Sequence, residues 1–429
     1  MNNLTCYCYN YKCIVDCNNN NWSCNNNNIC ERNDFEYSFF NMFLLLGVFL
    51  ISILSSIAGI GGGALLISFF NILGNFKIYY SIPLCVISIA GNSLCRMIYL
   101  INRKHYLNKY RFLINYTILL IFLPFDSAFS IFGYILNIIS STFLTNLLMV
   151  ILLGLVSFKT FKKGFNQCKK EKEKLLINGL SFDIVRKKNI EIDGIIIEID
   201  TDEYSNKILN MIGEYKYLPY FYNLFFIVMC LLTYNFVRIK NGYSICDYNF
   251  IFYSAIHVLC FLLIGIFTLI YICRIQKYRD SINFFYLPNE IRWKCKNIII
   301  FVIFSSFVSI ISTFLGIGGG MIFVPLMLLY GIPPEIASST NSISTFFSSI
   351  TSSLQYLGTN SILPIYSILF FIISFIGSFI GLNIFNYIIL VHNKNSYLIF
   401  LLSFIIFISF ILMIINLINL EKNNKLNIC

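Results

Sequence analysis

Hydrophobic and polar positions along this chain are grouped into long blocks. Ten apolar blocks are long enough to cross a bilayer, because about 20 helical residues span its hydrocarbon core. A helix of this length satisfies its backbone hydrogen bonds internally, as lipid requires. The pattern therefore predicts an all-α, polytopic integral membrane protein. The blocks lie at roughly 37–57, 78–101, 112–132, 135–158, 218–238, 249–273, 297–315, 335–357, 362–385 and 397–420.

Two shorter apolar segments, at roughly 60–76 and 317–332, each begin with a glycine-rich motif. The motif Gly-Ile-Gly-Gly-Gly starts at Gly59 and recurs 257 residues later at Gly316. Glycine costs about 1 kcal/mol per residue relative to alanine in a helix, and unwound backbone in lipid needs other partners. The same weak point in two halves predicts broken helices around a transporter binding site. Close helix packing is the alternative reason for the glycines.

With these segments the chain has about 10–12 transmembrane segments in two pseudo-repeats. We expect five regions. They are a Cys/Asn-rich tail (1–36), a first membrane repeat (37–160), a charged cytoplasmic linker (161–216), two connecting spans with a basic loop (217–296), and a second membrane repeat (297–429).

Basic loops that begin at Arg103, Lys159 and Arg274 favour one orientation, since all three can be cytoplasmic together. If the glycine-led segments cross, the N-terminus is extracytoplasmic and the two repeats are inverted. If they are re-entrant, the N-terminus is cytoplasmic and the repeats are parallel. Crossing also puts His392 and Lys394 inside, so we favour crossing and an inverted repeat.

The N-terminal tail is rich in cysteine, and two glycosylation acceptor patterns start at Asn3 and Asn21. An even number of cysteines on an exposed tail predicts disulfides in an oxidising compartment. Zinc binding and an unpaired, disordered tail are the alternatives. The tail cysteines are Cys6, Cys8, Cys13, Cys17, Cys24 and Cys30.

The linker 161–216 begins basic and turns acidic. Isoleucines at strand-like spacing surround Asp193-Gly194, a tight-turn dipeptide, which predicts a small hairpin on a flexible linker. A solvated connection between the halves and a docking role both remain open.

Composition agrees with a membrane protein. Hydrophobic residues make up 57% and charged residues 12% of the chain, about half the charged fraction of a soluble domain. The mean hydropathy is +0.74. The net charge of +11 is concentrated in a few loops, so it reports orientation in the membrane and not nucleic-acid binding.

Polar side chains follow both glycine motifs inside apolar blocks. Hydroxyls, amides and the positive end of a half-helix can replace the hydration shell of an anion. Serine and threonine can instead bond the carbonyl four residues earlier. The candidate substrate-binding residues are Gly59, Gly61, Gly62, Gly63, Ser88, Asn92, Ser93, Gly316, Gly318, Gly319, Gly320, Pro325, Thr340, Asn341 and Ser342.

Asp126 is an acid in the middle of a predicted span, two residues after Pro124. An intramembrane acid costs about 2.5–3.5 kcal/mol on insertion scales, so Asp126 is a proton-coupling candidate. The alternative is a proline break that faces water or polar backbone. Arg96 is expected to snorkel to the nearby membrane surface. No HExxH, GxSxG or P-loop pattern occurs, so we expect no enzyme, cofactor or metal site.

These motifs resemble the sulfite exporter TauE/SafE family, in its eukaryotic, plant-like branch. The resemblance implies a permease for sulfur-containing or other small organic anions that does not hydrolyse ATP. Ser68 stands where the second repeat has Pro325, a departure from the pattern. The resemblance rests on Leu315–Gly320, Pro325-Leu326, Gly331–Thr340, Phe347–Ser349, Gln355-Tyr356 and Ser396–Phe400, and more thinly on Gly59–Gly63, Ile82–Leu84 and Lys159-Thr160.

The sequence and the resemblance together predict a transporter that moves a small anion, such as sulfite or a sulfonate, by alternating access. Its partners are then the anion and the lipid bilayer, without nucleic acid, and a homo-oligomer is left open. A membrane scaffold or receptor that uses the tail and linker, or an ion channel, is the alternative. Plasma and internal membranes are both open.

Overall fold

The structure, a computed structural model, describes residues 8–9, 12–13, 22–24, 30–32, 39–74, 76, 78–105, 108–187, 218–240, 247–281, 291–357, 362–392 and 396–426.

Helices dominate the described residues, and the strands form three two-stranded antiparallel sheets. The helices are α1 (Phe39–Ala58), α2 (Gly63–Ile72), α3 (Ile78–Leu100), α4 (Tyr116–Ile139), α5 (Thr142–Lys187), α7 (Leu218–Lys240), α8 (Tyr248–Ser281), α9 (Cys295–Leu315), α10 (Gly320–Leu329), α11 (Pro334–Tyr356), α12 (Pro364–His392) and α13 (Ser396–Leu426). The strands are β1 (Cys8–Tyr9), β2 (Lys12–Cys13), β3 (Trp22–Cys24), β4 (Cys30–Arg32), β5 (Lys104–His105) and β6 (Asn108–Phe112).

The all-helical membrane fold is confirmed. Nine helices of the described residues are long and apolar enough to cross a membrane, and α2 and α10 are the two shorter apolar helices. The remaining predicted block, 335–357, corresponds to the 23-residue helix α11, which is too polar to join the nine. Most of α11 is nevertheless buried, so protein and not lipid surrounds it.

Each repeat consists of a long helix, a glycine break, a ten-residue helix and three further helices: α1–α5 in the first and α9–α13 in the second. The equivalent helices α5 and α13 run antiparallel, because Gly154 packs against Phe410 and Phe161 against Phe400. The repeats are therefore inverted relative to each other, as the sequence favours.

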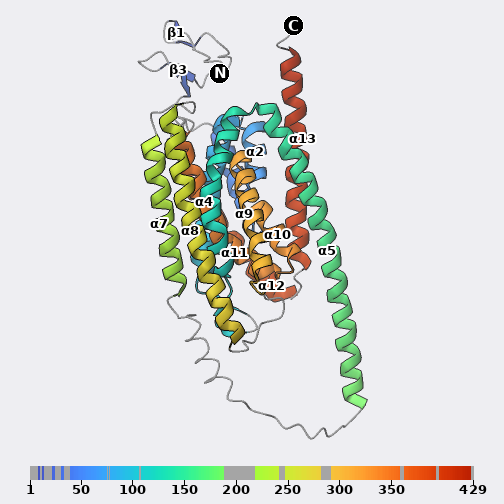
Figure 1. The fold of residues 1–429 in the computed structure, drawn as a ribbon. Helices are drawn as coiled ribbons and strands as arrows, with labels where there is room; N and C mark the ends of the chain where they lie inside the picture. Colours follow the sequence, from blue (N-terminus) through green and yellow to red (C-terminus); the bar gives the residue numbers. More distant parts are fainter. Residues whose placement is uncertain are drawn as a thin grey trace.

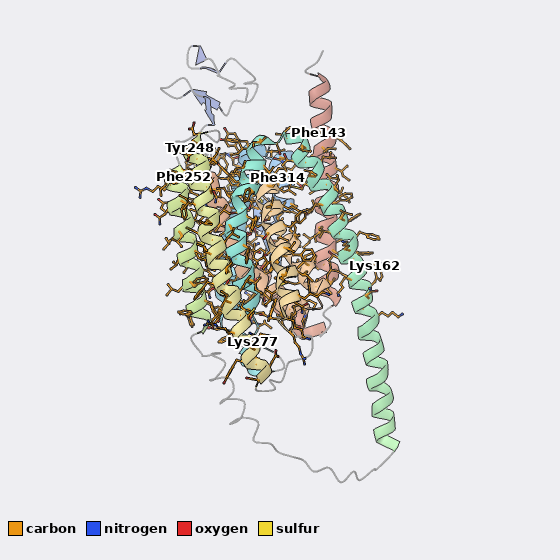
Figure 2. The ribbon with its side chains drawn as sticks, in the orientation of Figure 1. Phe143, Lys162, Tyr248, Phe252, Lys277 and Phe314 are labelled. Atoms are coloured by element: carbon orange, nitrogen blue, oxygen red, sulfur yellow. The ribbon has the colours of Figure 1, made fainter. Side chains whose placement is uncertain are left out.

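Figure 1 shows α7 and α8 at one edge of the bundle and α5 and α13 at the other, with α4, α9 and α11 between them. In Figure 2, Phe314 near the end of α9 lies at the same end of the bundle as Phe143, and Lys277 of α8 lies at the opposite end. Helix α9 therefore ends in the half of the bundle that holds Phe143.

The two repeats hold each other through matching pairs of helices: α1 packs on α12, and α9 packs on α4. Small residues allow these pairs to approach closely. A Cβ at Gly377 would lie 2.8 Å from the carbonyl oxygen of Phe49, and one at Gly133 would overlap the carbonyl oxygen of Ile310. Close packing therefore explains glycines such as these, outside the two motifs.

The predicted boundary between the spans 112–132 and 135–158 is wrong by about seven residues. Helix α4 continues to Ile139 although Pro124 lies within it. The break comes where Ser141 caps α5, its Oγ accepting the N–H of Leu144 at 3.3 Å. The hydropathy pattern does not reveal this helix start, because it is set by one local hydrogen bond and not by a change from apolar to polar residues.

Helix α5 continues to Lys187, so the segment that we expect to be a flexible linker begins as a helix. Figure 1 shows this part of α5 extending away from the bundle. The hairpin expected around Asp193-Gly194 lies outside the described residues.

In the tail, the strand register places Cys8 opposite Cys13 and Cys24 opposite Cys30. The cysteine side chains lie outside what the structure describes, so disulfides, zinc binding and an unpaired tail all remain expectations.

Candidate functional site

The two glycine motifs lie against each other inside the bundle. A Cβ at Gly63 would overlap the carbonyl oxygen of Ile317, so the two backbones are in direct contact. The N–H of Ala64 donates to the Sδ of Met321 at 3.5 Å. Because α2 and α10 both begin at this contact, the N-termini of the two short helices meet.

This glycine junction, formed by residues 59–63 and 316–320, uses backbone conformations that favour glycine. Gly59 has a φ of 79° and Gly316 a φ of 65°, at equivalent places directly after α1 and α9. A left-handed φ costs a non-glycine residue about 1–2 kcal/mol. The two glycines therefore end the long helices and let the chain turn.

Each short helix returns beside the long helix that precedes it. Phe69 of α2 packs against Gly47 of α1, and Tyr330, at the end of α10, packs against Phe301 of α9. Ten helical residues cover about 15 Å, or half the hydrocarbon core. The glycine-led segments thus run back through only half of the bilayer. Even so, each reverses the direction of the chain, as a full crossing would, so the two repeats have opposite orientations.

Helix α11 carries a stripe of buried polar side chains. Residues three and four apart share one face of a helix. The stripe consists of Ser338, Asn341, Thr345, Ser348 and Ser352.

Most of this stripe lies against the glycine junction, and Asn341 and Thr345 lie at its centre. The Nδ2 of Asn341 donates to the carbonyl oxygen of Gly59 at 2.9 Å, which ties the second repeat to the first break. Thr345 lies beside Gly61 and Gly318, and its buried Oγ1 has no hydrogen-bond partner among the described residues. Thr345 is absent from the residues that the sequence selects, although its position one turn after Asn341 signals it.

The rest of the polar run in α11 has other partners. The Oγ1 of Thr340 accepts the backbone N–H of Asn115 at 3.0 Å, just before α4. The hydroxyl of Ser342 donates to the carbonyl oxygen of Ser338 at 2.9 Å, within its own helix. Of Thr340, Asn341 and Ser342, the structure brings only Asn341 into hydrogen-bond contact with the junction.

In the first repeat, Ser88 and Ser93 bond within α3, whereas Asn92 bonds across to α1. Ser88 and Ser93 each donate to the carbonyl oxygen four residues earlier, at 2.7 and 2.6 Å. The Nδ2 of Asn92 donates to the Oγ of Ser55 at 2.7 Å, one turn before the break. The bonding pattern that serines favour in membrane helices therefore describes Ser88 and Ser93.

The remaining glycines of the junction differ in their surroundings. Gly62 has a φ of 73° and lies against Ser55. Gly319 has a helical φ of −54°, and a Cβ there would meet the Oγ of Ser348 at 3.5 Å, an ordinary contact. Gly320 lies against Asn341.

Arg96 of α3 is buried, not snorkelling, so that expectation is wrong. Its side chain is 1% exposed, and its Nη2 donates to the carbonyl oxygen and the Oγ of Ser338, both at 3.0 Å. Its Nε has no hydrogen-bond partner, and no carboxylate pairs with it, among the described residues. A charged side chain inside a span costs about 2.5–3.5 kcal/mol on insertion scales, so Arg96 is a candidate functional residue.

Asp126 is also 1% exposed, so it does not face water in this structure. The Oγ of Ser309 donates to its backbone carbonyl at 2.7 Å, and the hydroxyl of Ser348 lies near its carboxyl group. Ten residues of α11, or about 15 Å, separate Ser348 from Ser338. Asp126 and Arg96 therefore lie near opposite ends of the polar stripe and do not form a pair.

Two cavities lie near the Arg96 end. A small one, of about 10 Å³, is bordered by Ser338 and Leu328. A larger groove of about 400 Å³ is bordered by Lys159 and Lys163 of α5 and by Pro325 and Leu328 of α10. Pro325 therefore borders this groove, and Leu328 lies between the two spaces. Figure 2 labels Lys162 on the same part of α5. No group of three potential metal ligands occurs in the described part of the chain.

Comparison with known proteins finds similarity to one family. The family model for Sulfite exporter TauE/SafE matches residues 250–425, from α8 to α13. Sulfite exporter TauE/SafE family protein 2 of Arabidopsis thaliana is 25% identical over 389 residues, which cover 82% of this chain and 78% of the relative. Family protein 6 of the same plant is 34% identical over 106 residues, 24% of each chain, and family protein 5 is 43% identical over 67 residues, 16% of this chain and 15% of the relative. No solved structure matches the chain.

Proposed function

We propose that this chain, a member of the sulfite exporter TauE/SafE family of membrane transporters, carries a small anion across a membrane by alternating access around the glycine junction. A sulfite or sulfonate ion is the substrate class that we propose. The names of the similar plant proteins support sulfite, and the neutral and cationic donors of the site support an oxyanion in general.

The observation that carries the proposal is the meeting of the two short-helix N-termini at Gly63 and Ile317. Each helix N-terminus is equivalent to about half a positive charge. Two such ends in contact, away from water, repel each other unless an anion lies between or beside them. The unpartnered hydroxyl of Thr345 at the same place supplies a further donor.

The inverted repeats support alternating access as the mechanism. Helix α2 packs against α13, and its equivalent α10 packs against α5. Movement of one short helix against its outer partner opens the junction to one side of the bundle, and the equivalent movement of the other opens it to the opposite side.

Flux in vesicles tests the proposal. The purified protein is reconstituted, and uptake of radiolabelled sulfite and methanesulfonate is followed against an outward or inward anion gradient. We expect saturable flux that follows the gradient of at least one anion. The absence of gradient-dependent flux for sulfite, methanesulfonate, taurine and sulfate contradicts the proposal.

The two other classes that the sequence leaves open give different results. A channel conducts currents far larger than a carrier cycle allows. A scaffold loses its cellular phenotype when the tail and the 161–216 linker are removed, whereas a transporter keeps its flux.

We also propose the membrane orientation, with the tail extracytoplasmic and the linker cytoplasmic. Figure 1 shows β1 and β3 at one end of the bundle and the C-terminal end of α5 at the other, which supports opposite sides. Glycan attachment at Asn3 or Asn21, with protease access to the linker only from the cytoplasm, is the expected result. Labelling of both segments from one side contradicts it.

A further inference from the structure

We infer that Arg96 is the fixed countercharge for the transported anion, so that the site selects a monoanion over a dianion. This inference rests on the proposed function and adds to it the charge of the substrate.

The argument begins with the incomplete bonding of Arg96. Only Ser338 accepts hydrogen bonds from its guanidinium among the described residues, both through Nη2. The buried Nε has no partner. A buried cation that is neither paired nor fully hydrogen-bonded is costly unless another group binds it for part of the working cycle.

Arg96 also stands directly beside the first glycine break. A Cβ at Gly59 would lie 3.3 Å from the Nη2 of Arg96, and Ser338 packs against the same glycine. The carbonyl oxygen of Gly59 is held by Asn341, one turn along α11 from Ser338. An anion at this place contacts both the guanidinium group and the start of the unwound segment.

The geometry of the side chain suits an oxyanion. A guanidinium group offers planar, parallel N–H donors that match two oxygens of a carboxylate, phosphate or, by the same geometry, sulfonate group. An ammonium group offers only a point charge. Because Nη2 is already held by Ser338, the donor direction along Nε is fixed before the anion arrives.

Charge balance then sets the selectivity. Asp126 lies near Ser348, whereas Arg96 bonds Ser338, and these two serines are about 15 Å apart along α11. Asp126 therefore does not neutralise Arg96. A monoanion bound to Arg96 gives a neutral pair, whereas a dianion leaves one uncompensated negative charge in a region without water. For sulfite, the transported form is then the hydrogensulfite ion.

A route towards Arg96 begins on the side of α10. The groove bordered by Lys159 and Lys163 concentrates anions near α10 through its positive charge. Leu328 separates this groove from the 10 Å³ cavity at Ser338, which is too small for a sulfonate. Anion access therefore requires movement of α10, in agreement with alternating access.

The test compares wild-type protein with Arg96→Gln, Arg96→Lys and the control Arg103→Gln in vesicles. Arg103 lies just beyond α3, exposed, where it bonds the hydroxyl of Tyr99. Methanesulfonate is the labelled monoanion and sulfate the competing dianion. We expect Arg96→Gln to weaken the apparent affinity for methanesulfonate at least tenfold, Arg96→Lys to weaken it less, and Arg103→Gln to stay within twofold.

A second measurement separates binding from folding. Methanesulfonate should raise the thermal midpoint of the detergent-solubilised wild type, because a ligand stabilises the state that binds it. It should leave the midpoint of Arg96→Gln unchanged. If Arg96→Gln does not fold, Arg96→Lys and the preference of the wild type for methanesulfonate over sulfate decide the matter.

Wild-type affinity in Arg96→Gln overturns the inference, as does tighter competition by sulfate than by methanesulfonate, and in both cases the proposed transport function stands. Absence of flux in the wild type for every anion instead removes the proposed function itself.

Discussion

The two glycine breaks begin alike but then differ, because the second left-handed glycine is Gly62 in the first break and Gly318 in the second. Both long helices end at a left-handed glycine, Gly59 or Gly316, and both are followed by a ten-residue helix. The hydroxyls of Ser88 and Ser93 in α3 bond within their own helix. Helix α11, the equivalent of α3, instead reaches across to the first repeat through Asn341.

This difference shows that one helix can serve both breaks. Helix α11 is too polar to face lipid, so it lies inside, where its polar stripe contacts both glycine segments. Helix α3 supplies the charge, Arg96, and α4 supplies Asp126. The inverted repeats therefore share a backbone plan and divide the chemistry unequally.

The largest expected effect is a loss of stability on substitution of Gly63, compared with Gly319. A Cβ at Gly63 would overlap the backbone oxygen of Ile317, which cannot move without displacing the facing repeat. We expect Gly63→Ala to lose about 1–3 kcal/mol of stability or more, and to lower both the thermal midpoint and the yield. Gly319→Ala is the matched control, because its Cβ makes only ordinary contacts. Equal stability of the two variants means that the breaks do not touch as described.

The next effect concerns transport alone. Gly319→Val adds bulk toward Ser348 and favours a continuous helix, at a position whose φ is already helical. We expect flux to fall at least tenfold while expression and membrane insertion stay near wild type. Gly319→Ala, again the control, should keep most of its flux. A well-folded Gly319→Val protein with normal flux refutes the anion site at the junction.

A smaller effect is expected from the hydrogen bond that joins the repeats. Asn341→Ala leaves the buried carbonyl oxygen of Gly59 without its side-chain donor, which costs about 1–3 kcal/mol. Ser342→Ala removes a buried bond within α11 only, so we expect a loss at the low end of a hydrogen bond's net contribution, about 0.5 kcal/mol. Thermal denaturation of both variants measures the difference, and similar midpoints argue against a special role for Asn341.

The smallest structural change, Asp126→Asn, tests whether Asp126 couples transport to protons. Asp126→Asn keeps the shape of the side chain but removes its proton-binding carboxylate. If Asp126 couples transport to protons, an imposed pH gradient accelerates anion flux in the wild type but not in Asp126→Asn, whereas flux down an anion gradient persists in both. Serine variants of α3, such as Ser88→Ala, should retain that acceleration. Unchanged pH coupling in Asp126→Asn assigns the coupling to another group.

Particular residues show how far prediction from sequence reaches. The glycine motifs at Gly59 and Gly316, and the short helices after them, are predicted because backbone propensity is local. Asn341 and Ser342 are adjacent polar residues with the same kind of sequence around them. Only Asn341 forms a hydrogen bond with the junction. Which of them does so depends on the rotation of α11 against its neighbours.

Arg96 gives the clearest failure of the sequence alone. Its distance from the end of α3 suggests snorkelling, but α11 covers that part of α3 and encloses the side chain. Burial of a charged residue depends on what packs over it and not on its depth along its own helix. No sequence pattern within α3 carries that information.

By itself, the sequence determined the membrane class, most helices and the two places where helices break, because hydropathy and backbone conformation act over a few neighbouring residues. The tertiary structure alone decided that the breaks meet, that Thr345 and Arg96 lie beside them, and that Asp126 lies near the far end of the same polar stripe. These are contacts between segments more than 200 residues apart, and their geometry is set by how inverted helices pack against each other.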